Sequence, residues 1–168
     1  SVPMSETSSD ATAGTQLRIC VGASFGGHMN ELLQLLKHTE SWPCAPALYV
    51  TTGPELVRKL QQMGPTQSIG ECNRKHPLQI VRVLTKAMVI VLRHRPDVLV
   101  TTGSLPLAIL GLWVRAFGGK LVWIDSIANM TEFSMSGRLV YRLANLFVTQ
   151  WEDLAETHER ARYFGQLI

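Results

Sequence analysis

The sequence predicts an α/β fold with a doubly wound, Rossmann-like parallel sheet. Two observations predict this fold. Short apolar runs alternate along the chain with longer segments of helical periodicity, which gives a parallel sheet with right-handed crossovers. Glycine and small polar residues follow several of the runs, and such folds bind ligands where their strands end. With 168 residues, 46% of them hydrophobic, the chain is long enough for one domain with a real core.

The first strand–turn–helix unit occupies residues 17–36. An apolar run, 17–21, leads into the turn Gly22-Ala23-Ser24-Phe25-Gly26-Gly27, and a helix follows with Met29, Leu32, Leu33 and Leu36 on one face. A helix start supplies free N–H groups and the positive end of its dipole, and glycines let a ligand approach the backbone. This pattern predicts an anion site at Ser24, Gly26 and Gly27, with His28 at its mouth. The alternative is a tight turn whose glycines serve packing only.

The later elements follow in order. Strands are predicted at residues 47–51, 97–101, 120–124, 146–149 and 161–164, which makes six in all. Helices are predicted at 54–63, 78–93 and 105–117, and from a cap at Ser134 or Ser136 to about 144. Residues 64–77 are expected to be a polar loop, and 151–160 a short connection.

Polar residues at the strand ends form a predicted binding edge. Thr102, Gly103 and Ser104 follow the third strand, Asp125 and Ser126 follow the fourth, and Gln150 follows the fifth. Ser104 is also suited to cap the helix that begins there. Because the carboxyl ends of parallel strands meet at one edge, these residues are expected to converge on the His28 turn.

Two helices are candidates for a membrane-facing surface. Arg82, Lys86 and Arg93 fall on one stripe of helix 78–93, and the apolar helix 105–117 carries Trp113 and Arg115 near its end. A basic stripe beside apolar surface is typical of peripheral binding to an anionic membrane. A solvated stripe and a buried helix are the alternatives. The uncharged run 98–114 is broken by a polar turn and does not predict a membrane span.

Composition narrows the remaining function classes. The net charge of +3 is mildly basic, and aromatic residues are not interleaved with basic ones, so no nucleic-acid partner is expected. Cys20, Cys44 and Cys72 are widely spaced, which favours a reducing compartment. The sequence has no metal-binding spacing, and no metal is expected. Residues 1–16 are expected to be a disordered leader whose first residues resemble a cloning remnant, and residues 17–168 a single Rossmann-like domain.

Several ordered motifs resemble those of one family. They are Ser24-Phe25-Gly26-Gly27-His28 with Glu31-Leu32-Leu33, Arg95-Pro96-Asp97 with Thr102-Gly103, the run SMSGRLVY at 134–141, and Gln150-Trp151. The family is the asparagine-linked glycosylation protein fourteen-like group of oligosaccharide-biosynthesis proteins, which includes bacterial exopolysaccharide transferase subunits. The likeness runs from about Leu17 to the last residue.

The resemblance implies the acceptor-binding half of a split GT-B glycosyltransferase. A separate small subunit would hold the UDP-sugar, so the chain is expected to be inactive alone and to need no cofactor of its own. The implied acceptor is a polyprenyl-diphosphate-linked sugar, which places the chain peripherally on the cytoplasmic face of a membrane. The missing D-x-D agrees with GT-B chemistry, which needs no bound metal. A non-catalytic membrane anchor that recruits a catalytic partner is the second hypothesis, and a small nucleotide-binding domain is a third.

Two residues are candidates for the base of an inverting transfer, in which an acceptor hydroxyl attacks C1 of the UDP-sugar. His28 suits this role because an imidazole titrates near neutral pH, although it could instead bond the turn or an acceptor phosphate. Asp125 is the rival, with a strand-end cap as its alternative. The family usually has Glu-Ser where this chain has Asp125-Ser126, and Asn129 stands in place of an arginine. From these two departures we expect a sugar specificity different from that of the family.

Overall fold

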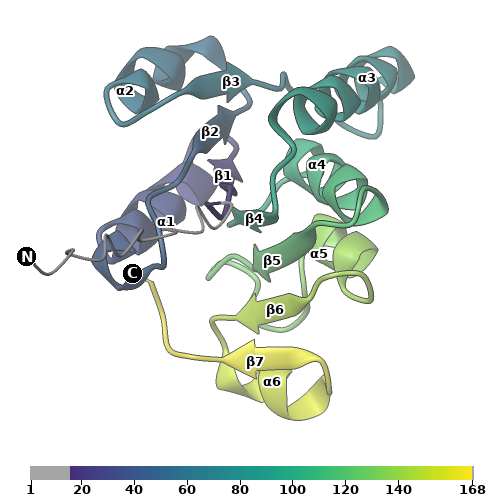
Figure 1. The fold of residues 1–168 in the computed structure, drawn as a ribbon. Helices are drawn as coiled ribbons and strands as arrows, with labels where there is room; N and C mark the ends of the chain where they lie inside the picture. The colour runs from purple at the N-terminus through teal and green to yellow at the C-terminus, as the bar shows by residue number, and fades with distance from the viewer. Residues whose placement is uncertain (1–15, 168) are drawn as a thin grey trace, which may run out of the picture.

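The computed structural model describes residues 16–167, which form one parallel sheet of seven strands in the order β3-β2-β1-β4-β5-β6-β7 (Figure 1). The expected leader lies outside the described residues, apart from residue 16. The strands are β1 (Ile19–Ala23), β2 (Leu48–Thr51), β3 (Thr66–Ser68), β4 (Val98–Thr101), β5 (Lys120–Ile124), β6 (Leu146–Thr149) and β7 (Ala161–Tyr163). The sheet order reverses between β1 and β4, and doubly wound sheets bind ligands at such a switch point. The predicted fold class is confirmed.

Helices cover the sheet on two sides. They are α1 (Gly27–Leu36), α2 (Val57–Gln61), α3 (Pro77–His94), α4 (Leu105–Ala116), α5 (Met135–Val140) and α6 (Glu152–Thr157), with 3-10 turns at Thr39–Ser41 and Pro54–Leu56. The apolar faces of α3, α4, α5 and α6 pack in one core cluster with the sheet. The apolar residues of α1 and α2 belong to a second cluster on the other side. Figure 1 shows the two layers on either side of the strands.

Two elements of the structure are absent from the sequence prediction. Residues 64–77, expected to be a loop, contain β3, whose sequence Thr-Gln-Ser carries no apolar signal. This edge strand forms because its backbone pairs with β2, which a sequence pattern does not report. Residues 151–160, expected to be a connection, contain α6, whose one fully buried side chain is Leu154. The helix that follows Ser134 ends at Val140 rather than near 144.

The structure decides between the alternatives for the apolar helix α4. Seven of its residues, from Pro106 to Val114, are buried in the described chain, because α3 and α5 pack on either side. The Arg115 side chain donates from Nε to the carbonyl of Leu143 at 2.8 Å and from a terminal nitrogen to that of Gly119 at 3.2 Å. Trp113 is half-buried and stacks on Phe117. Arg115 thus joins α4 to the turn that follows α5, and α4 is a core helix.

Candidate functional site

The turn between β1 and α1 opens directly onto the start of a helix. Gly26 precedes α1 with a φ of +97°, and within residues 16–167 no side chain caps the helix and no acidic residue lies in its first turn. A Cβ added at Gly26 or Gly27 would meet no atom within 4 Å, so the space above the helix start is open. The first N–H groups of a helix have no partner inside it. This turn therefore offers N–H donors and a positive dipole end to an anion.

His28 links this turn to the end of β4. Its Nδ1 donates to the carbonyl oxygen of Thr102 at 3.0 Å, and the Thr102 hydroxyl donates back to the His28 carbonyl. Because a carbonyl can only accept, the proton of a neutral ring sits on Nδ1, and Nε2 keeps its lone pair. The imidazole is half-buried. The contact therefore fixes the tautomer in which Nε2 could take a proton from a substrate.

The turn from β4 into α4 lies against the same imidazole. Gly103 has a φ of +128°, and a Cβ there would lie 2.9 Å from both Cε1 and Nδ1 of His28. Ser104 follows with φ +102° and ψ 160°, a region of the backbone map that is essentially reserved for glycine. Within the described chain, the buried Oγ of Ser104 has no hydrogen-bond partner. A strained residue with an unpartnered hydroxyl thus stands at a second helix start, next to the imidazole.

Asp125, the other candidate base, is held by structural contacts. It is 2% exposed, and its Oδ1 accepts from Trp123 Nε1 at 3.1 Å and from the Ser134 hydroxyl at 2.7 Å. Its Oδ2 accepts from the Ser134 N–H at 3.0 Å. Ser134 in turn accepts from Gly137 N–H and so caps α5, which answers the choice between Ser134 and Ser136. These contacts match the strand-end alternative, and His28 keeps the free acceptor nitrogen.

Ser126 and Asn129 lie in a turn that follows β5. The Ser126 hydroxyl accepts from Ala128 N–H at 3.2 Å, and the Ser126 carbonyl accepts from Asn129 N–H at 3.1 Å. Ser126 and Asn129 are both partly exposed. The turn is therefore ordered by its own bonds and presents both side chains at the carboxyl edge.

Glu31 and Gln150 join the parts of this edge. Gln150 was predicted to lie at the edge, whereas Glu31 was not among the predicted site residues. Glu31 lies on α1, and its Oε1 accepts from Ile127 N–H at 2.9 Å and from Gln150 Nε2 at 3.0 Å. Gln150 follows β6 and also donates to the carbonyl of Asp125 at 3.0 Å. The available signal was a carboxylate three residues after His28, on a helix with no other Asp, Glu, Lys or Arg. A sequence does not reveal that such a side chain is buried.

The structure divides the predicted residues into separate groups. His28 bonds to Thr102 and lies against Gly103, which Ser104 follows in the chain. The Asp125–Asn129 segment is joined to α1 through Glu31. The stripe Arg82, Lys86 and Arg93 is exposed on α3, whereas Trp113 and Arg115 belong to the packed α4 and do not join it. Within residues 16–167, no cluster of three His, Cys, Asp or Glu side chains could hold a metal ion. No helix in that range is long and apolar enough to cross a membrane.

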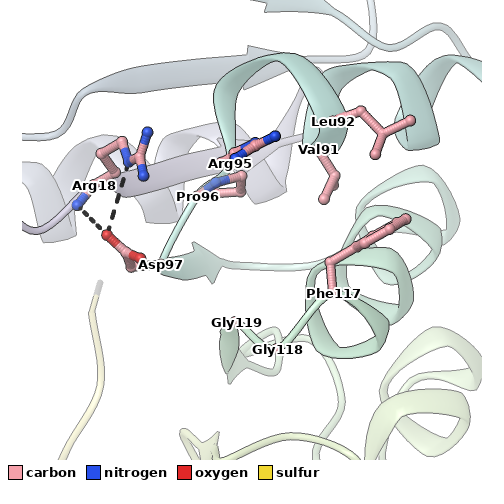
Figure 2. Close-up of a pocket in the computed structure, with 9 residues that line it drawn as sticks. All are labelled: Arg18, Val91, Leu92, Arg95, Pro96, Asp97, Phe117, Gly118 and Gly119. Carbon is pink, nitrogen blue, oxygen red and sulfur yellow. Dashed lines mark hydrogen bonds and ion pairs between the residues drawn. The ribbon is translucent and has the colours of Figure 1, made fainter.

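A cavity of ≈ 430 Å³ lies at the opposite edge of the sheet (Figure 2). It surrounds the Arg95-Pro96-Asp97 motif, at the amino end of β4. Asp97 Oδ2 accepts from the backbone N–H of Arg18 at 2.8 Å and forms an ion pair with its side chain at 4.0 Å. The motif therefore fastens the segment before β1 to the segment before β4, far from His28. We assign it a structural role.

Comparison with known proteins gives a consistent picture. The family model described as oligosaccharide biosynthesis protein Alg14 like matches residues 51–167. A UDP-N-acetylglucosamine transferase subunit ALG14 from Eremothecium gossypii is 28% identical, over 92% of this chain and 82% of its own length. The subunit of the same name from Homo sapiens is 24% identical, over 96% of this chain and 88% of its own length. The sequence likeness thus extends over nearly the whole chain.

Solved structures support the fold. MurG from Acinetobacter baumannii superposes with a TM-score of 0.63 at 16% identity, over 79% of this chain and 41% of that one. UDP-GlcNAc 2-epimerase from Methanocaldococcus jannaschii gives 0.67 at 14% identity, over 89% and 46%. The chain spans less than half the length of these two proteins, and the likeness to them is one of fold. The family-model match, which spans most of the chain, establishes that this chain belongs to the Alg14-like family of oligosaccharide biosynthesis proteins.

Proposed function

We propose that this chain is the acceptor-binding, membrane-associating subunit of a two-component inverting glycosyltransferase. The assembled enzyme would transfer a hexose from a UDP-sugar to a polyprenyl-diphosphate-linked saccharide in oligosaccharide or exopolysaccharide biosynthesis. A small donor-binding subunit would hold most of the UDP-sugar. The family supports this role, and the relatives' name makes UDP-N-acetylglucosamine the first donor to test. The chain itself needs no resident cofactor for it.

One observation carries the proposal: His28 presents a free Nε2 between two helix starts at the switch point of the sheet. The α1 start at Gly26-Gly27 and the α4 start at Ser104 both direct N–H donors toward this region, which suits the acceptor diphosphate. The Thr102 carbonyl holds the imidazole in the tautomer that a general base requires. The acceptor hydroxyl would lose its proton to Nε2 as its oxygen attacks C1 of the sugar, and UDP would leave from the opposite face.

The exposed side of α3 supports peripheral binding to an anionic membrane. Its exposed apolar side chains include Leu78 at 86%, Val81 at 58%, Val89 at 40% and Leu92 at 49%. Arg82, Lys86 and Arg93 are exposed along the same helix and could meet acidic headgroups on the cytoplasmic face. The acceptor is itself anchored in a membrane, so this face would bring the His28 site to it.

Replacing His28 by alanine in the assembled complex tests the role of the imidazole. If His28 is the base, turnover should fall by about 10²–10⁴-fold while acceptor binding changes little. If it only binds the diphosphate, the apparent KM for the acceptor should rise and turnover at saturation should be kept. The matched control is His38→Ala, because His38 is exposed and lies beyond the end of α1.

The same experiment separates the catalytic role from that of a recruiting anchor. Co-purification with the donor subunit and binding to vesicles should be unchanged in the His28 variant. Near wild-type rates at both low and saturating acceptor would exclude both roles of His28 and favour the anchor. Asp125 would then be the remaining candidate within this chain.

A further inference from the structure

Glu31 is a buried carboxylate that the proposed chemistry does not use. It lies one turn after His28 on α1 and is 1% exposed. Its Oε1 accepts hydrogen bonds from Ile127 N–H at 2.9 Å and Gln150 Nε2 at 3.0 Å, while its Oε2 is buried without a partner among residues 16–167. The two ion pairs among residues 16–167 involve the carboxylates of Asp97 and Glu132, so neither pair neutralises Glu31.

A buried carboxylate with no cation beside it is costly to the fold. A glutamine of the same shape could keep both Oε1 contacts without the charge. The fold therefore does not need the charge, and its effect is to be sought at the surface above it. That surface is the turn Ser126–Asn129.

The carboxylate decides which kind of hydrogen bond Ser126 can offer to a ligand. Ser126 Oγ donates to Glu31 Oε1 at 3.4 Å and accepts from Ala128 N–H at 3.2 Å. A hydroxyl has one proton, and here that proton is directed to the carboxylate. What Ser126 has left for a ligand is a lone pair, which accepts from O–H or N–H groups. The Ile127 N–H is also occupied by Glu31, so these two groups have no proton to give to a phosphate.

The other end of the site has the opposite polarity. The starts of α1 and α4 present N–H donors and the positive ends of two helix dipoles, and the Ser104 hydroxyl there is unpartnered within the described chain. A phosphate is stabilised at that end and repelled by the carboxylate under the Ser126 turn. The site is thus polarised along the carboxyl edge of the sheet.

We propose that Ser126, oriented by Glu31, recognises hydroxyl or amide N–H groups of the acceptor saccharide, while the diphosphate lies at the helix starts. The inference rests on the proposed function and fixes the direction in which the acceptor lies. It also separates Ser126 from Gly26, Gly27 and Ser104, which the sequence placed in one phosphate-binding set. Glu31 acts through Ser126 and is a positioning residue.

The test uses the complex of this chain with its donor subunit and compares two ligands. Transfer to the lipid-linked acceptor gives kcat and apparent KM, and inhibition by inorganic pyrophosphate probes the phosphate end alone. Ser126→Ala should raise the acceptor KM about 10-fold, the usual effect of one lost hydrogen bond. Glu31→Gln keeps an oxygen that accepts from Ser126 but loses the charge that strengthens this bond, so it should raise the acceptor KM by a smaller factor. Both variants should leave pyrophosphate inhibition at least as strong. Gly27→Ala, which adds a methyl group in the open turn, should weaken pyrophosphate inhibition instead.

Two controls make the outcomes decisive. Glu156→Gln removes the same charge at an exposed position of α6 and should change neither constant. The thermal midpoint of Glu31→Gln should not fall, which separates a positioning role from a purely structural one. If Ser126→Ala both weakened inhibition by pyrophosphate and raised the acceptor KM, the phosphate would lie at Ser126 and the inference would be overturned. An unchanged KM in both variants would overturn it too, and if the wild-type complex transfers sugar, the proposed function survives either result.

Discussion

Replacing Gly103 by alanine tests whether the turn before α4 controls the position of His28. At a φ of +128° the new side chain is strained in any surroundings, and its Cβ would lie 2.9 Å from two atoms of the imidazole. Backbone strain of this kind costs about 1–2 kcal/mol. The ring must also move, which breaks the Nδ1 bond to Thr102 and costs about 0.5–1.5 kcal/mol more. The free energy of unfolding should therefore fall by about 2–3 kcal/mol.

Gly118→Ala is the matched control for this substitution. Gly118 also has a positive φ, +89°, but a Cβ there would meet nothing within 4 Å. In urea unfolding of the purified chain, Gly118→Ala should lower the free energy of unfolding only by the cost of backbone strain, about 1–2 kcal/mol. In the assembled complex, Gly103→Ala should lower turnover about 100-fold, since a displacement of about 1 Å can cost that much, and Gly118→Ala should not. Equal stability losses in the two variants, with equal turnover, would show that Gly103 does not position His28.

Three further predictions follow from the chain's surface, partner and thiols. The purified chain with UDP-sugar and lipid acceptor should transfer no sugar, and activity in that assay would refute the split-enzyme proposal. The chain should float with anionic vesicles at low salt and less at high salt, because surface charges are screened; Arg82→Glu with Lys86→Glu should abolish flotation, and unchanged flotation would exclude the α3 stripe. Burial raises the pKa of Cys20 from 9.0 to about 12, so the folded protein keeps a proton that the unfolded chain loses. That contribution to stability is complete below pH 9 and declines as the pH rises toward 12, and Cys20→Ala should flatten this part of the stability–pH curve.

The sequence predicted the elements whose apolar pattern matches their burial. β5 and β6 have the predicted bounds, and α3 differs by one residue at each end, because their side chains report packing directly. β3 was missed because its Thr-Gln-Ser sequence gains its structure from backbone pairing with β2. For α4, a pattern that is apolar all round is the same for a helix in a core and a helix at a bilayer. Only the arrangement of α3 and α5 around it distinguishes the two.

In the candidate site, features made by neighbouring residues could be predicted from the sequence, whereas contacts between distant residues could not. The Gly26-Gly27 turn and His28 follow one another in the chain, so the pattern of strand, glycines and helix predicts them. The bond from His28 to Thr102 spans 74 residues, and the one from Glu31 to Gln150 spans 119. Contacts over such separations depend on the strand order, which the sequence leaves open. Glu31 was therefore visible only as part of a motif and not as a buried charge.

The buried polar atoms left without partners connect fold and function. Within residues 16–167 there are four of them on side chains, and the three on Glu31, Thr51 and Ser104 belong to residues near the carboxyl edge of the sheet. Folding alone gains nothing from such atoms, and each costs about 1–3 kcal/mol when water is excluded. The backbone strain at Ser104 adds to that cost at the same edge. A ligand that accepts a hydrogen bond from the Ser104 hydroxyl would relieve part of this cost, and a saccharide joined to a diphosphate carries such acceptors at its phosphate end.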